Sequence, residues 1–227
     1  MIREKPILFN TYMVRAILDG RKIVTRRKID IDIVNQFDVE HDGKTVTAYI
    51  NQETGDCYSP AEICRYQLGD ILYVRETFCP NYFDESIAGY RGDGLRGNRN
   101  AYKADYNKAV VGDAVPEPKW HPSIHMPKEA ARIWLKVTDV RVERLQNMVL
   151  DDFLNEGISI PYEAFNDPEN AYMQSKMAFI HTWDSTISKE QHDLYGWDAN
   201  PWVWVIEFKN SEKPEGEFTG FTSAETA

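Results

Sequence analysis

Two side chains that could carry out hydrolysis stand three residues apart in a strongly basic segment. Lys22 and Thr25 lie in a run of eight residues of which five are Lys or Arg. Threonine becomes a nucleophile when a base removes its proton, and a lysine with a lowered pKa can act as that base. Like-charge repulsion from the neighbouring arginines, Arg21, Arg26 and Arg27, would lower the pKa of Lys22. The pattern fits acyl transfer or hydrolysis, and it fits phosphate binding without chemistry equally well.

The positive charge of this segment contrasts with the rest of the chain. The sequence has 36 acidic and 26 basic residues and a formal net charge of −10, yet residues 1–30 hold eight Lys or Arg and three acids. The acidic total argues against broad binding to a nucleic-acid backbone, which requires a basic surface. A small positive site on an acidic body fits a phosphate, a nucleotide or a short RNA. The alternative is a solvated charged face.

Length and composition favour a folded protein. Of the 227 residues, 42% are hydrophobic and 12% aromatic, which excludes global disorder. No run approaches the ~20 consecutive apolar residues of a membrane span, and the first residues lack the apolar stretch of a secretion signal. The three cysteines, Cys57, Cys64 and Cys79, are too few for a disulfide framework. We therefore expect a protein of a reducing cytoplasm, without membrane association.

The basic segment is expected to follow a short helix. The apolar run 6–9 predicts a buried strand, and Asn10 then suits the N-cap of a helix that ends at Asp19-Gly20. The alternation at 29–33 predicts a strand. Other predicted strands cover 44–50, 71–74, 133–137, 140–142 and 202–208, and predicted helices cover 148–156 and 170–185, the latter with Met173, Met177, Ile180 and Trp183 near one face. This order predicts an α+β fold, a small mixed β-barrel with helices outside.

Residues 77–128 differ from their surroundings because they are rich in Gly, Asn and Pro and show little periodicity. So long a segment predicts an insertion or binding loop. Its residues 92–97, GDGLRG, have the letters of the dinucleotide-binding fingerprint, but the strand and helix that the fingerprint needs are not predicted around them. Pro122, between His121 and His125, disfavours a helical metal pair. No metal or cofactor is therefore expected.

Several segments together resemble the ASCH (activating signal cointegrator homology) family. They read PILF at 6–9, ILDGRKIVTRR at 17–27 and LGDILYVRE at 68–76, with agreement at 133–142, 154–158 and 202–208. Residues 122–127 and 200–204 are similar to the larger, phage- or prophage-borne members. The resemblance implies a PUA-like β-barrel domain over 5–209 that carries the insertion at about 77–128. Residues 210–227 are rich in Glu, Gly, Ser and Thr and predict a flexible tail.

The resemblance also implies a function. PUA-like barrels bind RNA or modified bases in a cleft beside the barrel, and one small bacterial ASCH type removes the acetyl group of N4-acetylcytidine. The positions that match its Lys, Thr and Glu are Lys22, Thr25 and Glu156. In that scheme Lys22 activates Thr25, Thr25 attacks the acyl carbon and Glu156 serves the proton transfers. Other relatives are ribonucleases or non-catalytic RNA-binding modules. A third interpretation is a phage accessory protein whose insertion binds a host protein.

Other side chains have the chemistry of a nucleotide pocket. Arginines that suit a phosphate are Arg21, Arg26, Arg27 and Arg75, rings that could stack on a base are Tyr73, Trp120 and Trp134, and His125 could hydrogen-bond to the base. The expected partner is a modified nucleoside or single-stranded RNA. The expected location is the cytoplasm of a bacterium, or of the host cell if a phage encodes the chain.

Overall fold

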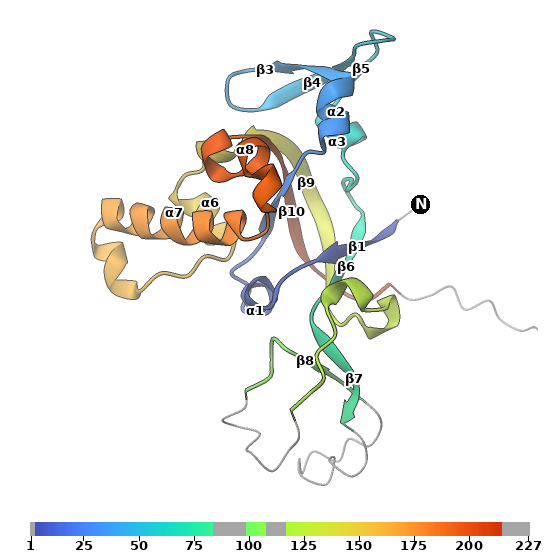
Figure 1. The fold of residues 1–227 in the computed structure, drawn as a ribbon, viewed down its shortest axis with the longest axis vertical. Coiled ribbons are helices and arrows are strands. Elements are labelled where there is room, and N and C mark those ends of the chain that lie inside the picture. Colours follow the sequence, from blue (N-terminus) through green and yellow to red (C-terminus); the bar gives the residue numbers. More distant parts are fainter. Residues whose placement is uncertain (1–2, 84–98, 108–116, 215–227) are drawn as a thin grey trace, which may run out of the picture.

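The computed structural model describes residues 3–83, 99–107 and 117–214, and a five-stranded sheet forms its centre (Figure 1). The strand order is β1-β6-β9-β10-β2, with β1 and β6 parallel and the other pairs antiparallel. The strands are β1 (Glu4–Leu8), β2 (Val24–Lys28), β6 (Ile71–Arg75), β9 (Trp134–Arg144) and β10 (Trp202–Ser211). Because β2 is an edge strand, one of its sides has no strand neighbour in this sheet.

Two smaller sheets lie at opposite ends of the central one, as Figure 1 shows. Their strands are β3 (Phe37–His41), β4 (Val46–Asn51) and β5 (Cys57–Tyr58) in one, and β7 (Phe78–Phe83) and β8 (Arg99–Tyr102) in the other. The predicted mixture of strands and helices is confirmed. Among the described strands, however, no sheet closes into a barrel, because β1 and β2 remain the two edges of the central sheet.

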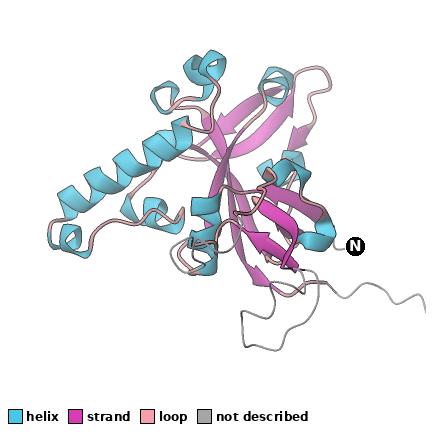
Figure 2. Ribbon diagram, turned by 60° about the horizontal axis from the view of Figure 1, so that its bottom comes forward, coloured by secondary structure: helices cyan, strands magenta, loops and turns pink. Residues whose placement is uncertain are grey.

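The helices pack beside the sheets (Figure 2). They are α1 (Thr11–Leu18), α2 (Ile31–Gln36), α3 (Pro60–Ile63), α6 (Leu150–Asn155), α7 (Pro168–Asp184) and α8 (His192–Tyr195). The prediction for α1 is confirmed at both ends, since Asn10 accepts a hydrogen bond from Met13 N and Asp19 is the C-cap. Within the described ranges, none of the helices has both the length and the apolar character needed to cross a bilayer.

The central sheet separates two hydrophobic clusters, and β10 contributes alternate residues to both. Trp204, Ile206 and Phe208 belong to the cluster that includes residues of α1 and β4. Val203 and Val205 belong to the cluster that includes residues of α6 and α7. This alternation is what a strand covered on both faces requires. Both faces of β10 are therefore covered by apolar side chains.

The strand predicted at 29–33 is wrong. The strand β2 ends at Lys28, and Ile31–Gln36 forms the helix α2. Ile31 and Val34 are largely exposed, while Ile33 packs against the first cluster. The helix α2 partly buries one apolar side chain and leaves the others exposed. The alternation of Ile with Asp does not distinguish this arrangement from an edge strand.

The face predicted for α7 is only half confirmed, because Trp183 is buried and Ile180 packs against the second cluster, but the two methionines do not. Met173 and Met177 are 49% and 65% exposed, and the buried residues are Ala171, Ser175, Phe179 and Trp183. The rings of Phe179 and Trp183 stack with their centroids 6.2 Å apart, and Phe179 also contacts Phe153. The buried face is therefore the one that has aromatic residues to pack against. It brings the last turns of α7 toward β2.

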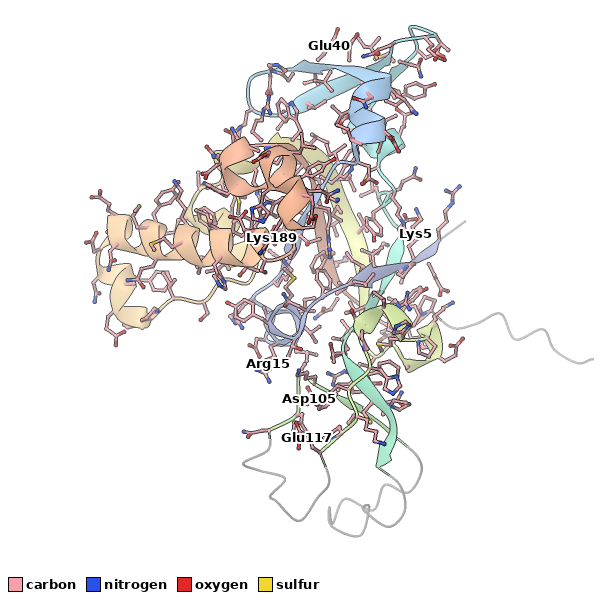
Figure 3. All side chains as sticks on the ribbon, viewed as in Figure 1. Lys5, Arg15, Glu40, Asp105, Glu117 and Lys189 are labelled. Atoms are coloured by element: carbon pink, nitrogen blue, oxygen red, sulfur yellow. The ribbon has the colours of Figure 1, made fainter. Side chains whose placement is uncertain are left out.

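Described parts of the predicted insertion are anchored to the rest of the fold. Arg132 donates to Glu76 (Nε to Oε1, 2.9 Å) and to Asp105 (Nη2 to Oδ1, 3.2 Å). Arg15 of α1 donates to the Ala104 carbonyl (2.7 Å), and Figure 3 shows Arg15 and Asp105 where α1 approaches this segment. The segment therefore begins as the ordered β7–β8 ribbon. The GDGLRG motif at 92–97 lies outside the described residues.

Candidate functional site

Lys22 and Glu156, 134 residues apart in the chain, form a buried ion pair. The Lys22 Nζ lies 2.5 Å from Glu156 Oε2, and the two side chains are 0% and 5% exposed. Nζ also donates to the carbonyl oxygens of Val24 (2.8 Å) and Glu156 (3.0 Å). Since an ammonium has three donors, all of them are engaged in this conformation.

The ends of two helices bring this pair together. The chain leaves α1 through Gly20, at φ 73°, and Lys22 N then donates to Ala16 O (3.0 Å). The chain leaves α6 at Glu156, followed by Gly157 at φ 91°. Lys22 and Glu156 meet as an isolated antiparallel bridge between these two exits. Positive φ favours glycine, so both exits depend on the residue type.

Gly157→Ala is expected to lower the free energy of unfolding by about 2–4 kcal/mol, through strain at positive φ plus overpacking. A Cβ at this position would lie 2.6 Å from Ala16 Cβ and 3.0 Å from Lys22 Cβ. Gly20→Ala is the matched control, because its φ is 73° and no heavy atom lies within 4 Å of the added Cβ. Urea unfolding of both variants measures the difference. Equal losses would show that the close approach at Gly157 does not matter.

Arg26 neutralises the carboxylates of the site. Its guanidinium, with the side chain 0% exposed, lies 2.9 Å from Asp152 Oδ1, 3.3 Å from Glu156 Oε1 and 3.5 Å from Glu143 Oε2. Buried charges require such partners. Arg26 therefore contacts Glu156 through Oε1 while Lys22 contacts Oε2, and both terminal nitrogens of its guanidinium already face carboxylates.

Burial lowers the pKa of Lys22. Loss of hydration is the largest cause, Glu156 opposes it, and the charges of Arg27 and Arg26 add smaller effects in the same direction as burial. The sequence-based reasoning had the direction right but placed the cause in like-charge repulsion. Arg21 takes no part, because it turns away to Gly157 O (2.6 Å) and Asp19 (2.8 Å).

A cavity of about 450 Å³ lies along the open edge of β2. Both Thr25 and Glu156 line it, whereas Lys22 is not part of the lining. Other lining residues come from the end of α7 and the residues just after it, and from the segment after α3, among them Thr182, Trp183, Thr186, Cys64, Arg65 and Tyr66. The cavity thus combines a threonine hydroxyl, a carboxylate backed by a buried lysine, and aromatic rings.

The structure divides the predicted site residues into two groups. Arg26 and Arg27 line the cavity beside Thr25 and Glu156, whereas Arg21 lines a separate pocket. The other predicted residues do not line the cavity. Tyr73 packs on Trp134, with the ring centroids 5.9 Å apart, and Arg75 donates to Ile124 O. Trp120 contacts Tyr106, and His125 is exposed. They surround the β7–β8 side of the molecule.

Sequence reasoning missed Glu143, Asp152 and the α7 residues of the cavity. Asp152 precedes Glu156 by one helical turn, a spacing that places both on one face, and this signal was available. Glu143 and the α7 residues gave no local signal.

Cys64 also lines the cavity, but burial raises the pKa of its thiol to about 11, so it is not the thiolate nucleophile at neutral pH.

Among the residues that the structure describes, no cluster of His, Cys, Asp or Glu has the arrangement of a metal site. Comparisons of the chain with family models, with curated proteins and with solved structures gave no match. The function is therefore inferred from the geometry of this site and from the sequence resemblance.

Proposed function

We propose that the cavity beside β2 binds a modified nucleoside and that Thr25, Lys22 and Glu156 remove an N-acyl group from its base. One observation supports this most. A lysine and a glutamate distant in sequence form a buried pair, and the glutamate shares a cavity wall with a threonine. Removing two charges from water is expensive, and pairs with such perturbed groups in a cavity are typical of functional sites.

The chemistry begins with a proton transfer from Lys22 to Glu156, which leaves an uncharged amine and an uncharged acid. Burial favours this neutral form. The Lys22 amine exchanges its contact with Val24 O for the Thr25 hydroxyl and takes its proton as the oxygen bonds to the acyl carbon. The C–N bond breaks, and Glu156 gives its proton to the leaving nitrogen. Water then hydrolyses the acyl-threonine ester, releasing a carboxylic acid and restoring the hydroxyl.

The proposed substrate class is an N4-acylated cytosine base, from the resemblance to ASCH amidohydrolases and their PUA-like fold. Trp183, Trp204 and Tyr66 line the cavity and offer ring faces for a planar base. The five-stranded sheet with an open edge at β2 is the part of the fold that would correspond to the barrel wall.

The test is release of cytidine from N4-acetylcytidine by the purified chain, followed by chromatography. Turnover is expected for the wild type and for Lys5→Met. This control removes a lysine that also pairs with a carboxylate, Asp70 (2.6 Å), but lies outside the cavity. Turnover is not expected for Lys22→Met. A folded wild type that converts no N4-acylated cytidine would remove the amidohydrolase proposal.

Binding without catalysis is the second candidate, and one observation favours it. All three donors of Lys22 are engaged by Val24 and Glu156, so Thr25 is not hydrogen-bonded to the base that must activate it. Tight binding of N4-acetylcytidine that leaves it intact would support this candidate. For the host-protein interpretation, Ile124 is the large apolar residue that is strongly exposed among those of residues 77–128 whose burial the structure describes.

A further inference from the structure

Arg27 differs from its neighbour Arg26 in having no carboxylate partner. Its Nη2 donates to the Leu8 carbonyl oxygen (2.7 Å), and its guanidinium lies over the Phe9 ring, 5.1 Å from the centroid. Its Nε is buried and has no hydrogen-bond partner among the described residues. The same holds for Arg26 Nε, but the other guanidinium nitrogens of Arg26 face carboxylates, which would repel an anion. Buried donors are nearly always hydrogen-bonded, so an orphaned one in a cavity wall calls for a ligand.

Two further cations at the cavity, Lys28 and Arg65, also have no carboxylate partner. Lys28 donates to Gln191 Oε1 (3.0 Å) and lies over the Tyr195 ring, and Arg65 lies over the Tyr66 ring. Across the described chain, neither forms an ion pair. Besides Glu156, which pairs with Lys22 and Arg26, Asp30 is the acidic residue of the lining. The cavity therefore keeps a surplus of positive charge on a chain of net charge −10.

The register of β2 places this charge beside the proposed nucleophile. Arg27 pairs with Trp204 and Thr25 pairs with Ile206, so both side chains leave the same face of the strand. All four residues line the cavity. Only Arg26 lies between Thr25 and Arg27, so in an extended strand their Cα atoms are about 7 Å apart.

We propose that Arg27 binds a phosphate group of the ligand through its Nε–H, with Lys28 and Arg65 adding charge. This proposal deepens the proposed function. The identity of the base rests on that function, whereas the phosphate site does not. The substrate is then a phosphorylated nucleoside, either a mononucleotide or a nucleotide within RNA, instead of a free nucleoside. Burial lowers the pKa of Arg27, and a bound anion would offset the lost hydration that causes this shift. The fork of a guanidinium matches phosphate oxygens.

Titration calorimetry with four probes tests this proposal: cytidine, cytidine 5′-monophosphate, inorganic phosphate and a short single-stranded RNA. The wild type should bind the monophosphate roughly 10- to 100-fold more tightly than cytidine, the range of one charge-assisted contact. Arg27→Gln should remove this preference and leave the affinity for cytidine unchanged. Arg65→Gln, at an exposed position, should reduce it severalfold without disturbing the fold.

Arg144→Gln is the matched control. Arg144 also donates to a main-chain carbonyl (Asn200 O, 3.0 Å) and covers an aromatic ring (Trp202, 4.3 Å), but it does not line the cavity. It should keep the preference for the phosphorylated ligand.

The outcomes separate this proposal from the proposed function. Equal affinity of the wild type for cytidine and its monophosphate overturns the phosphate site and leaves the nucleoside site standing. Binding of phosphate and monophosphate without cytidine retains the phosphate site and argues against nucleoside recognition. Binding of none of the four probes overturns both. Tighter binding of RNA than of the monophosphate, lost in Arg27→Gln, identifies the phosphate as part of a polymer.

Discussion

Thr25→Val should reduce kcat for N4-acetylcytidine by roughly 10³-fold or more while leaving KM nearly unchanged, because the hydroxyl acts as nucleophile and not as a binding group. Valine has nearly the same shape, and it suits the strand position opposite Ile206. The residue is 2% exposed, so loss of a hydroxyl there does not expose new surface. Steady-state kinetics on the folded variant measures the effect.

Two control variants test whether the hydroxyl of Thr25 is responsible for the loss. Thr25→Ser preserves a hydroxyl and should retain measurable turnover, whereas Thr138→Val changes an exposed threonine of β9, outside the cavity, and should behave as the wild type. Full activity of Thr25→Val would exclude the acyl-threonine intermediate. If KM rose with kcat unchanged, Thr25 would be a binding residue.

Removing Glu156 should destabilise the protein more than removing Lys22. Glu156→Gln leaves the Lys22 ammonium buried without an anion, a situation that costs about 3–5 kcal/mol. In Lys22→Met, Glu156 keeps Arg26 at 3.3 Å and an apolar chain fills the space, so we expect a loss of about 1–2 kcal/mol. Urea unfolding gives both free energies. A larger loss for Lys22→Met would show that Arg26 does not compensate Glu156.

The deficit of Glu156→Gln should shrink as the pH is raised from neutrality. The pKa of Lys22 is lowered in the folded protein, and removing Glu156 removes the contact that opposes this lowering. The pKa of Lys22 is therefore lower in the variant than in the wild type. Between these two folded-state values, both below the unfolded value near 10.4, only the unfolded chain of the variant binds more protons than its folded form, so the variant alone gains stability as the pH rises. Unfolding curves at a series of pH values, compared with the wild type, provide the measurement. A constant or growing deficit would contradict the assignment to a buried ammonium.

Helices and strands could be predicted where the local sequence itself contains the signal. The helix α1 was predictable because Asn10 and Gly20 mark its ends, and β9 because its apolar residues alternate. The helix α2 and the buried face of α7 were not, since both depend on which neighbours are present to cover an apolar side chain. Periodicity cannot choose between two partly apolar faces of one helix.

For the candidate site, the sequence predicted the residues close to Lys22 and not those that complete it. Lys22 and Thr25 stood out through their spacing, and Glu156 came from the family resemblance alone. Arg26 was assigned to a phosphate because its nearest carboxylates lie 126 and 130 residues further along the chain. Whether an arginine has a carboxylate partner depends on such distant contacts, and this explains why Arg26 forms ion pairs while Arg27 donates to a main-chain carbonyl.

The pairing of β2 with β10 determines when this cavity can exist. Residues Val24–Lys28 form their strand against residues near the end of the described chain, and they have no other strand neighbour in the sheet. During synthesis β2 emerges early and must wait until β10 has been made. Contacts so distant in sequence form slowly, because the intervening loop must close first. The cavity is thus assembled late in folding, and a ribosome-bound chain that lacks β10 carries Lys22 and Thr25 without a site to hold them.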